Sequence, residues 1–488
     1  MTTIADDPRT KGLLAIVGFL VCVELASGIL QGYYTPIFSD IADHLGIADA
    51  DVNWFEAAQL IVSALVVPPL ARMGDLVGHK KVLLLSTAVT ALGSWVMAFA
   101  PSFTTFLIGS ALQGAYVVWL PLEVAIIYRR TAGTGRQNQL TRRSAAILVG
   151  ALELAVIVGA LTSGALVDAT SMTVLLALPA IAVTVCLIVI WFGIEDMEGT
   201  ATGGIDLGGL VLITSSIGLV MGGLIAIRLD GPASPLPWTL IALGLVVLYV
   251  FGRYELGQTE PLVDVRLLGT PGQWPVQLTA FLFGMSVLGA QIPLSTFART
   301  DPDVYGYGLG TTGFATSLII GIYLIGMIAG ALLFPVIARV TTPRLTLLGA
   351  SVLVGVGFLL FLPFHDAYLQ VVTNMVIVGL GSGALVAALP AAAASAAPDT
   401  QTGVATGLTN SVKTIGGAIA SCVFGIALLH GAASTASGVE GTAGSLEGYF
   451  IVWIVCGVTA LAAAVLLLFV PKRAFTDRVT EVETAPMV

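Results

Sequence analysis

The stretch GFLVCVELASGILQGYY, from Gly18 to Tyr34, is apolar along almost its whole length and carries one carboxyl group, Glu24, near its middle. It lies in a longer apolar run at about 12–35, and a helix of roughly 20 residues crosses the hydrocarbon core of a bilayer. The whole chain has the same character, because 57% of its 488 residues are hydrophobic and only 10% are charged. A soluble domain carries about 25% charged residues. The composition therefore indicates a membrane protein that spans the bilayer many times.

Fourteen apolar runs follow one another along the chain between short polar segments. They lie at about 12–35, 53–71, 82–100, 103–128, 144–167, 173–194, 207–227, 237–253, 275–298, 312–338, 345–364, 368–393, 402–430 and 449–470. A chain that spans lipid must satisfy its own backbone hydrogen bonds, and long uniform runs do so as helices. We therefore predict an all-α integral membrane protein with fourteen transmembrane helices.

The basic residues give the orientation of these spans. When the loops are assigned alternately to two sides, all but three of the 20 Lys and Arg residues fall on the N-terminal side. The exceptions are Arg228 and Arg299 on the opposite side and Lys413 within a span. Cytoplasmic loops of membrane proteins are enriched in Lys and Arg. We therefore expect a multi-pass protein of the plasma membrane with both termini in the cytoplasm.

A weak internal repeat divides the chain. QGAYVVWLP at 113–121 is similar to SGALVAALP at 382–390, and a second, fainter pair of segments has nearly the same offset. Chance similarity between helices rich in Ala, Gly and Leu is the alternative explanation. The repeat predicts two pseudo-symmetric six-helix bundles at 1–200 and 271–488, with two inserted transmembrane helices at 201–270. Such repeats are typical of alternating access, with a site near the membrane midplane between them.

Four carboxyl groups lie within the expected spans of the first bundle: Glu24, Glu56, Glu123 and Glu153. A charged carboxylate at the bilayer centre costs about 2.5–3.5 kcal/mol or more, so such residues need an explanation. One explanation is a water-accessible cavity in which the acids exchange protons or meet a cationic solute. The other is a protonated Glu that donates a hydrogen bond between helices, or a Glu that pairs with a basic residue. We predict that Glu24, Glu153 and Glu123 take part in proton coupling.

Polar and aromatic residues share helix faces with these acids, at spacings of three, four or seven residues. In the second bundle Asn410 and Lys413 lie one turn apart, and Lys413 is the only cation within an expected span. Lys413 could hold a buried carboxylate ionised, gate the site, or extend toward the headgroups. The residues that we expect to line a substrate cavity are Gln31, Glu56, Gln59, Gln113, Tyr116, Trp119, Asn410 and Lys413.

The stretch ARMGDLVGHKK at 71–81 resembles the signature loop between helices 2 and 3 of the major facilitator superfamily. In that family an Asp, a Gly three residues later and a basic cluster recur, and Asp75, Gly78, Lys80 and Lys81 match them. The resemblance implies conformational gating by these residues, with the Asp at a helix end tying the cytoplasmic halves together in the outward-facing state. The alternative is a basic loop that only anchors the topology.

Further stretches, among them GGIDLGGLVLITSSIGL and YELGQTEPLVDVRLL, resemble the fourteen-helix drug:proton antiporter branch of that family. The resemblance implies secondary active export of drug-like compounds, cationic or neutral and amphipathic, coupled to proton influx, as in multidrug efflux and antibiotic resistance. Ser110 stands where the branch usually has Arg, and no Pro follows Gly159. A proton-independent uniporter or symporter of the same fold therefore stays open, as does a membrane sensor that does not transport.

Other classes of protein have no support in the sequence. We find no phosphate-binding loop with its Lys and no nucleophile elbow, and the His and Cys residues do not cluster. We therefore expect no enzyme, no metal site and no cofactor. The expected partners are a small-molecule substrate, protons and the lipid bilayer, with no nucleic acid, and the expected state is a monomer.

Overall fold

The computed structural model describes residues 8–132, 137–199, 203–259, 261–397, 402–429 and 442–470. The boundary expected at 200–201 lies outside these ranges. So do the side chains of seven basic residues that the sequence assigns to the N-terminal side: Arg9, Lys11, Arg136, Arg142, Lys472, Arg473 and Arg478. Within the described ranges the chain is helical and contains no strand, which confirms the all-α prediction.

The helices up to residue 193 follow the first six apolar runs. They are α1 (Pro8–Gly32), η1 (Thr35–Ile37), α2 (Phe38–Leu45), η2 (Asp49–Val52), α3 (Asn53–Val77), α4 (His79–Ala98), α5 (Phe103–Gln113), η3 (Gly114–Val118), α6 (Trp119–Arg130), α7 (Gln137–Leu166) and α8 (Met172–Gly193).

The remaining helices follow the last eight runs. They are α9 (Leu207–Asp230), α10 (Pro235–Glu255), α11 (Val265–Leu268), α12 (Trp274–Phe283), η4 (Gly284–Leu288), α13 (Gln291–Arg299), α14 (Pro302–Tyr305), α15 (Gly313–Val340), α16 (Pro343–Leu359), α17 (Tyr368–Ser395), α18 (Thr402–Leu429) and α19 (Leu446–Leu467).

Thirteen helical spans among the described residues are long and apolar enough to cross a membrane. The remaining expected run, at 345–364, forms the shorter apolar helix α16, which has 17 residues. Polar side chains fix the start of several helices. Ser102, Thr312, Thr342 and Ser445 each accept a hydrogen bond from the backbone N–H three residues later, which satisfies a donor that the helix leaves unpaired.

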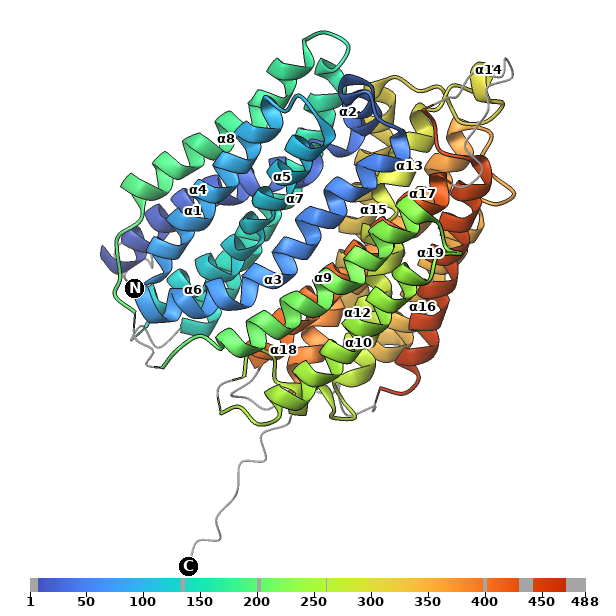
Figure 1. Cartoon of the computed structure of the whole chain (residues 1–488). Helices are drawn as coiled ribbons and strands as arrows, with labels where there is room; N and C mark the ends of the chain where they lie inside the picture. Colours follow the sequence, from blue (N-terminus) through green and yellow to red (C-terminus); the bar gives the residue numbers. More distant parts are fainter. Residues whose placement is uncertain are drawn as a thin grey trace, which may run out of the picture.

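The helices form two groups with a pair of helices across their boundary. Figure 1 shows α1–α8 (blue to teal) on one side of the molecule and α12–α19 (yellow to red) on the other. We call these groups the first side and the second side. The green helices α9 and α10 pack against each other, and α9 contacts both α3 and α18 at the boundary. The inserted pair therefore lies over the seam between the two sides.

The two ends of the molecule differ in charge. We call one of them the acidic end, because its loops and short helices carry Asp40, Asp43, Asp49 and Asp51. The opposite end, where α3 ends and α4 begins, carries Arg72, Lys80, Lys81, Arg129 and Arg130, and we call it the basic end.

The two sides are packed together toward the acidic end. The main contacts join α3 to α18 and α7 to α15. Ser317 at the start of α15 donates a hydrogen bond to the carbonyl of Ala160 at 2.8 Å. A Cβ atom on Gly164 would lie 2.4 Å from the carbonyl oxygen of Gly313, so glycine is needed where these helices meet.

Two ion pairs reinforce this closure. Arg299 of α13 pairs with Asp40 of α2, and Arg228 of α9 pairs with Asp51 of η2. These are the two basic residues that the sequence places on the side opposite the N-terminus. Both pair with acids of the first side. Arg299 belongs to the second side, and Arg228 belongs to the inserted pair.

Candidate functional site

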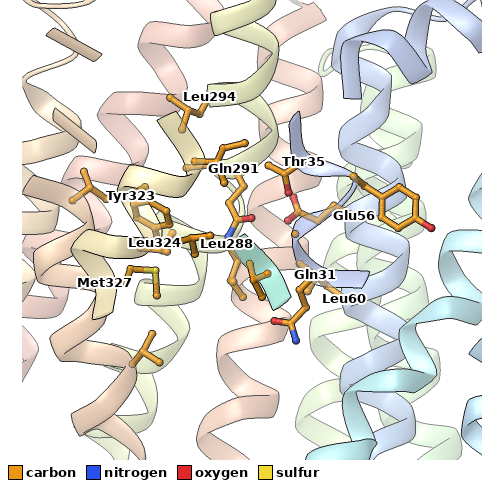
Figure 2. Close-up of a pocket in the computed structure, with 18 of the residues that line it drawn as sticks. Gln31, Thr35, Glu56, Leu60, Leu288, Gln291, Leu294, Tyr323, Leu324 and Met327 are labelled. Carbon is orange, nitrogen blue, oxygen red and sulfur yellow. The ribbon is translucent and has the colours of Figure 1, made fainter. Parts of the chain in front are cut away.

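A cavity of about 240 Å³ lies between the two sides of the molecule. Helices α1, α3 and α7 form one wall, and α12, η4, α13, α15, α17 and α18 form most of the other. Figure 2 shows Gln31, Thr35 and Glu56 on one side of this space, with Tyr323 and Met327 on the opposite side. The cavity is therefore bounded by residues that are far apart in the sequence.

The first side gives the cavity a polar wall. Gln31, Glu56, Gln59 and Tyr116, all expected from the sequence to line a cavity, lie along it. Glu153 of α7, which the sequence assigned to proton coupling, also lines this wall. Their presence at one surface is compatible with the roles predicted for them, and those roles remain predictions.

The second side gives the cavity a largely apolar wall. Phe283, Leu324, Met327 and Met375 line it. Met side chains adapt to irregular shapes, and a wall of this kind suits an apolar body without fixing its identity. Nothing in the sequence marks these residues, because an apolar residue that lines a cavity has the same local pattern as one in a packed core.

Three polar residues, one of them Lys413 of α18, interrupt this apolar wall. Gln291 of α13 and Tyr323 of α15 both line the cavity. The Tyr323 hydroxyl lies close to Ser382 and within electrostatic reach of Glu153. Gln291 had a usable signal in the sequence, since it is an amide within an expected span, whereas Tyr323 could equally have been a packing residue.

Glu153 and Lys413 face the same cavity from opposite sides of the molecule. Each lies within electrostatic reach of the other. No salt bridge, which would require a nitrogen–oxygen distance of 4.0 Å or less, joins them in the described part of the chain. The cavity therefore holds one acid and one base that attract each other without touching.

Glu56 has a direct partner on the other side of the seam. The hydroxyl of Ser421 on α18 donates a hydrogen bond to Glu56 Oε2 at 2.9 Å. Glu56 thus combines a position in the cavity wall with a hydrogen bond that holds α3 against α18. This contact favours a packing role together with a cavity role for Glu56.

Glu24 and Glu123 form a pair outside the cavity lining. Both side chains are fully buried, and their carboxyl groups are near enough to interact electrostatically, one on α1 and one on α6. None of their four oxygens accepts a hydrogen bond from a donor among the described residues. Two interacting carboxylates repel each other when both are ionised, and a shared proton relieves the repulsion.

Gln113 is the centre of a buried polar network. Its side-chain amide donates to the hydroxyl of Tyr34 at 3.1 Å and to the hydroxyl of Ser94 at 3.0 Å. Gln59 donates to its carbonyl oxygen at 3.5 Å. Gln113 is also the last residue of α5, where the span changes to the 3₁₀ segment η3. It lies behind the cavity wall and is not one of the lining residues.

Two further residues expected in the cavity lie elsewhere. Trp119 is fully buried, with its ring centroid 6.0 Å from that of Tyr116, and it does not line the cavity. Asn410 is half-buried on α18 one turn from Lys413, and it too is absent from the cavity wall. Their spacing of three or four residues from other polar residues predicted that both line the cavity. Such spacing shows which residues share a helix face, but it does not show which face borders the cavity.

The four residues of the signature loop lie together at the basic end. Asp75 Oδ1 lies 3.2 Å from Nε2 of His79. Lys80 donates to the backbone carbonyl of Trp191 at 3.0 Å, and Lys81 lies 3.7 Å from Asp196. Gly78 has φ of 110°, a left-handed value that favours glycine. In this state their polar contacts are with His79, with the end of α8 and with Asp196 just after it, all within the first side.

Comparison with known proteins agrees with this architecture. The family model described as Major Facilitator Superfamily matches residues 20–421 and 302–486. The chain is 26% identical over 454 residues to the cephamycin export protein CmcT of Amycolatopsis lactamdurans, covering 90% of this chain and 89% of that protein. It is 24% identical over 444 residues to the multidrug transporter protein MdtP of Bacillus subtilis (strain 168), covering 89% and 77%.

Solved structures show the same fold at lower sequence identity. An auto inhibited POT family peptide transporter superposes with a TM-score of 0.66 at 14% identity, covering 94% of this chain and 96% of that one. The family match extends over most of the chain and agrees with the helical membrane-spanning architecture. The chain therefore belongs to the major facilitator superfamily, a family of membrane transporters and not of enzymes.

Proposed function

We propose that this transporter exports small amphipathic organic compounds by alternating access, coupled to the entry of protons. The relatives named for cephamycin export and multidrug transport support the substrate class. A cavity with one polar and one largely apolar wall supports amphipathic cargo. The observation that carries the proposal is the buried pair of Glu24 and Glu123.

The pair is suited to hold and release a proton. Its two carboxyl groups face each other where no donor among the described residues neutralises them, so one proton between them lowers the free energy of the site. A change in the packing of α1 against α6, or entry of water, would alter that balance and release the proton. One proton moving down a membrane potential of 100 mV supplies about 2.3 kcal/mol.

Tyr116 links the pair to the cavity. Its side chain lines the cavity, and it lies within electrostatic reach of both Glu24 and Glu56. We propose that substrate binding and protonation influence each other through this residue. Glu153, which also faces the cavity, is a second candidate for proton coupling.

We propose that the basic end faces the cytoplasm, with both termini there and the protein in the plasma membrane. The enrichment of Lys and Arg at this end supports that orientation. Because the two sides are packed together at the acidic end, the structure then represents an inward-facing state. The division into bundles at 1–200 and 271–488 with inserted helices at 201–270, and the monomeric state, belong to the same proposal.

We propose that Asp75, Gly78, Lys80 and Lys81 act as a gate in the other state. In the present state these residues make their polar contacts within the first side. An outward-facing state would bring the second side against the basic end and offer them new partners. The gate would then form only after the contacts at the acidic end have opened.

The proposal is tested in two steps. A susceptibility screen in a host that lacks its own efflux pumps identifies a transported compound. Purified protein in proteoliposomes then moves that compound with and without an imposed pH gradient. We expect wild-type protein to accumulate the compound against its gradient only when the pH gradient is present.

Variants test the role of the pair. Glu24→Gln and Glu123→Gln should each abolish accumulation driven by the pH gradient, while downhill movement of the compound continues. Glu447→Gln, which changes an exposed carboxyl at the start of α19, is the matched control and should behave as wild type. Full coupling in both variants would exclude the pair from the mechanism. Transport by wild-type protein that a proton ionophore does not affect would favour a uniporter.

A further inference from the structure

Lys413 is held at a fixed place in the cavity wall by its backbone. A Cβ atom on Gly284 would lie 1.9 Å from the carbonyl oxygen of Lys413, so η4 packs directly against α18 at this residue. A Cβ atom on Gly416 would likewise lie 2.1 Å from the carbonyl oxygen of Phe281. This close packing leaves little freedom to the backbone that carries the Lys413 ammonium group, which therefore enters the cavity from a defined position.

The side chain of Lys413 faces the cavity, and no salt bridge involves it in the part of the chain that the structure describes. It is the only basic residue among the described residues that line the cavity, and it forms no salt bridge with Glu153. Glu56, the other acid of the cavity wall, already accepts a hydrogen bond from Ser421. Lys413 and Glu153 are thus a base and an acid on opposite walls of a space that a ligand can enter.

The other lining residues of the cavity suit a ligand that is apolar along most of its length and polar at one end. The apolar wall formed by Phe283, Leu324, Met327 and Met375 lies on the second side, while Glu153 lies on the first. A ligand that places an apolar body against this wall brings its polar end toward both charges. Placing a charged group beside an unpaired opposite charge in a partly dry site is favourable, whereas leaving either charge unpaired is costly.

We propose that Glu153 and Lys413 together select amphipathic zwitterions, binding an ammonium group at Glu153 and a carboxylate at Lys413. This inference rests on the proposed transport function and narrows its substrate class. A compound with only an ammonium group leaves Lys413 without a partner, and a compound with only a carboxylate leaves Glu153 without one. A zwitterion replaces the long-range attraction between the two residues with two direct contacts.

The test measures binding to purified protein in lipid nanodiscs without any gradient. Three fluorescent probes share one aromatic body: the zwitterion Nε-dansyl-lysine, its methyl ester, which keeps only the ammonium group, and its Nα-acetyl derivative, which keeps only the carboxylate. We expect the zwitterion to bind about tenfold more tightly than either derivative. Equal affinities for the three probes, or no binding of the zwitterion, would overturn the inference.

Variants assign each charge to its residue. Lys413→Met should weaken binding of the zwitterion and of the acetyl derivative while leaving the ester unchanged. Glu153→Gln should weaken binding of the zwitterion and of the ester while leaving the acetyl derivative unchanged. Exchanging the two residues in a Glu153→Lys, Lys413→Glu double variant should restore preference for the zwitterion in the reversed orientation.

Two controls separate recognition from packing and from transport. Met327→Leu changes the apolar wall and should affect all three probes alike. A variant of either charged residue that weakens all three probes equally would show a structural role and contradict the inference. Because no gradient is present, failure of this assay leaves proton-coupled export intact, whereas failure of that function appears only in the proteoliposome experiment.

Discussion

The ion pair between Arg299 and Asp40 should control how readily the acidic end opens. It joins α13 of the second side to α2 of the first side, and it exists only while the two sides are packed together at that end. Arg299 also donates a hydrogen bond to the carbonyl of Thr311 at 3.0 Å, which is within its own side. Asp40→Asn is therefore the cleaner change, because it weakens the contact across the seam and leaves the local one in place.

The expected effect follows from the burial of the pair. The two side chains are only 16% and 17% exposed, so solvent screens their attraction weakly. Two unit charges about 4 Å apart attract by about 4 kcal/mol at an effective dielectric constant of 20, and the loss of hydration offsets much of that. A net contribution of about 1–2 kcal/mol corresponds to a change of roughly 5–30-fold in the ratio of closed to open molecules.

Distance measurements between spin labels test this prediction. Labels at Thr170 and Asp303, which are exposed on the two sides near the acidic end, report its opening, with Cys22→Ser removing the exposed native thiol. Asp40→Asn should add a population at longer distance. The charge-exchanged Asp40→Arg, Arg299→Asp variant should restore the wild-type distribution, and Arg253→Gln, at an exposed position of α10, should leave it unchanged. An unaltered distribution in Asp40→Asn would refute the reasoning.

Three further substitutions test the packing around the cavity by thermal unfolding in detergent and by proteolysis. Gln113→Leu removes a buried amide that serves three partners and should cost about 1–3 kcal/mol, and an unchanged melting temperature would contradict the network. Gly284→Ala brings a methyl group against the carbonyl of Lys413 and should cost about 1–3 kcal/mol, whereas Gly252→Ala, where nothing lies within 4 Å, should not destabilise. Gly78→Ala forces a left-handed backbone value on Ala at a cost of about 1–3 kcal/mol and should speed proteolytic cleavage after α8.

The helical architecture could be predicted from the sequence because it depends on hydrophobicity summed over long segments. Each apolar run became a helix, including the run at 345–364, whose helix α16 is shorter than expected. The interruptions of regular helix within the spans could not be predicted from the sequence. The 3₁₀ segment η3 and the π-helical segment η4 occur in stretches that remain apolar, so no polar signal marks them.

Only part of the candidate site could be predicted from the sequence. Carboxyl groups in apolar runs are conspicuous, and this signal marks Glu24, Glu123 and Glu153 as candidates for proton coupling, a role that stays a prediction. The proximity of Glu24 to Glu123 could not be predicted from the sequence, because these residues belong to different helices and only tertiary packing brings them together. The apolar wall of the cavity could not be predicted either, since Met327 has no local sequence feature that distinguishes it from a core residue.

The interruptions of two helices explain how one cavity can be reached by both halves of the chain. The regular helix of the first span ends at Gly32 and the 3₁₀ segment η1 follows; Tyr34, just before η1, and Thr35, its first residue, line the cavity. The span that begins with α12 changes to the π-helical segment η4, and Val287 of η4 lines the cavity from the opposite side. In the expected repeat these two spans are the first helices of their bundles. Discontinuous helices near the membrane midplane are typical of the sites of transporters built from repeats. The two breaks therefore bring residues of both halves of the chain to one cavity, although the residues that form them share no visible sequence motif, and joint movement of the two walls stays a prediction.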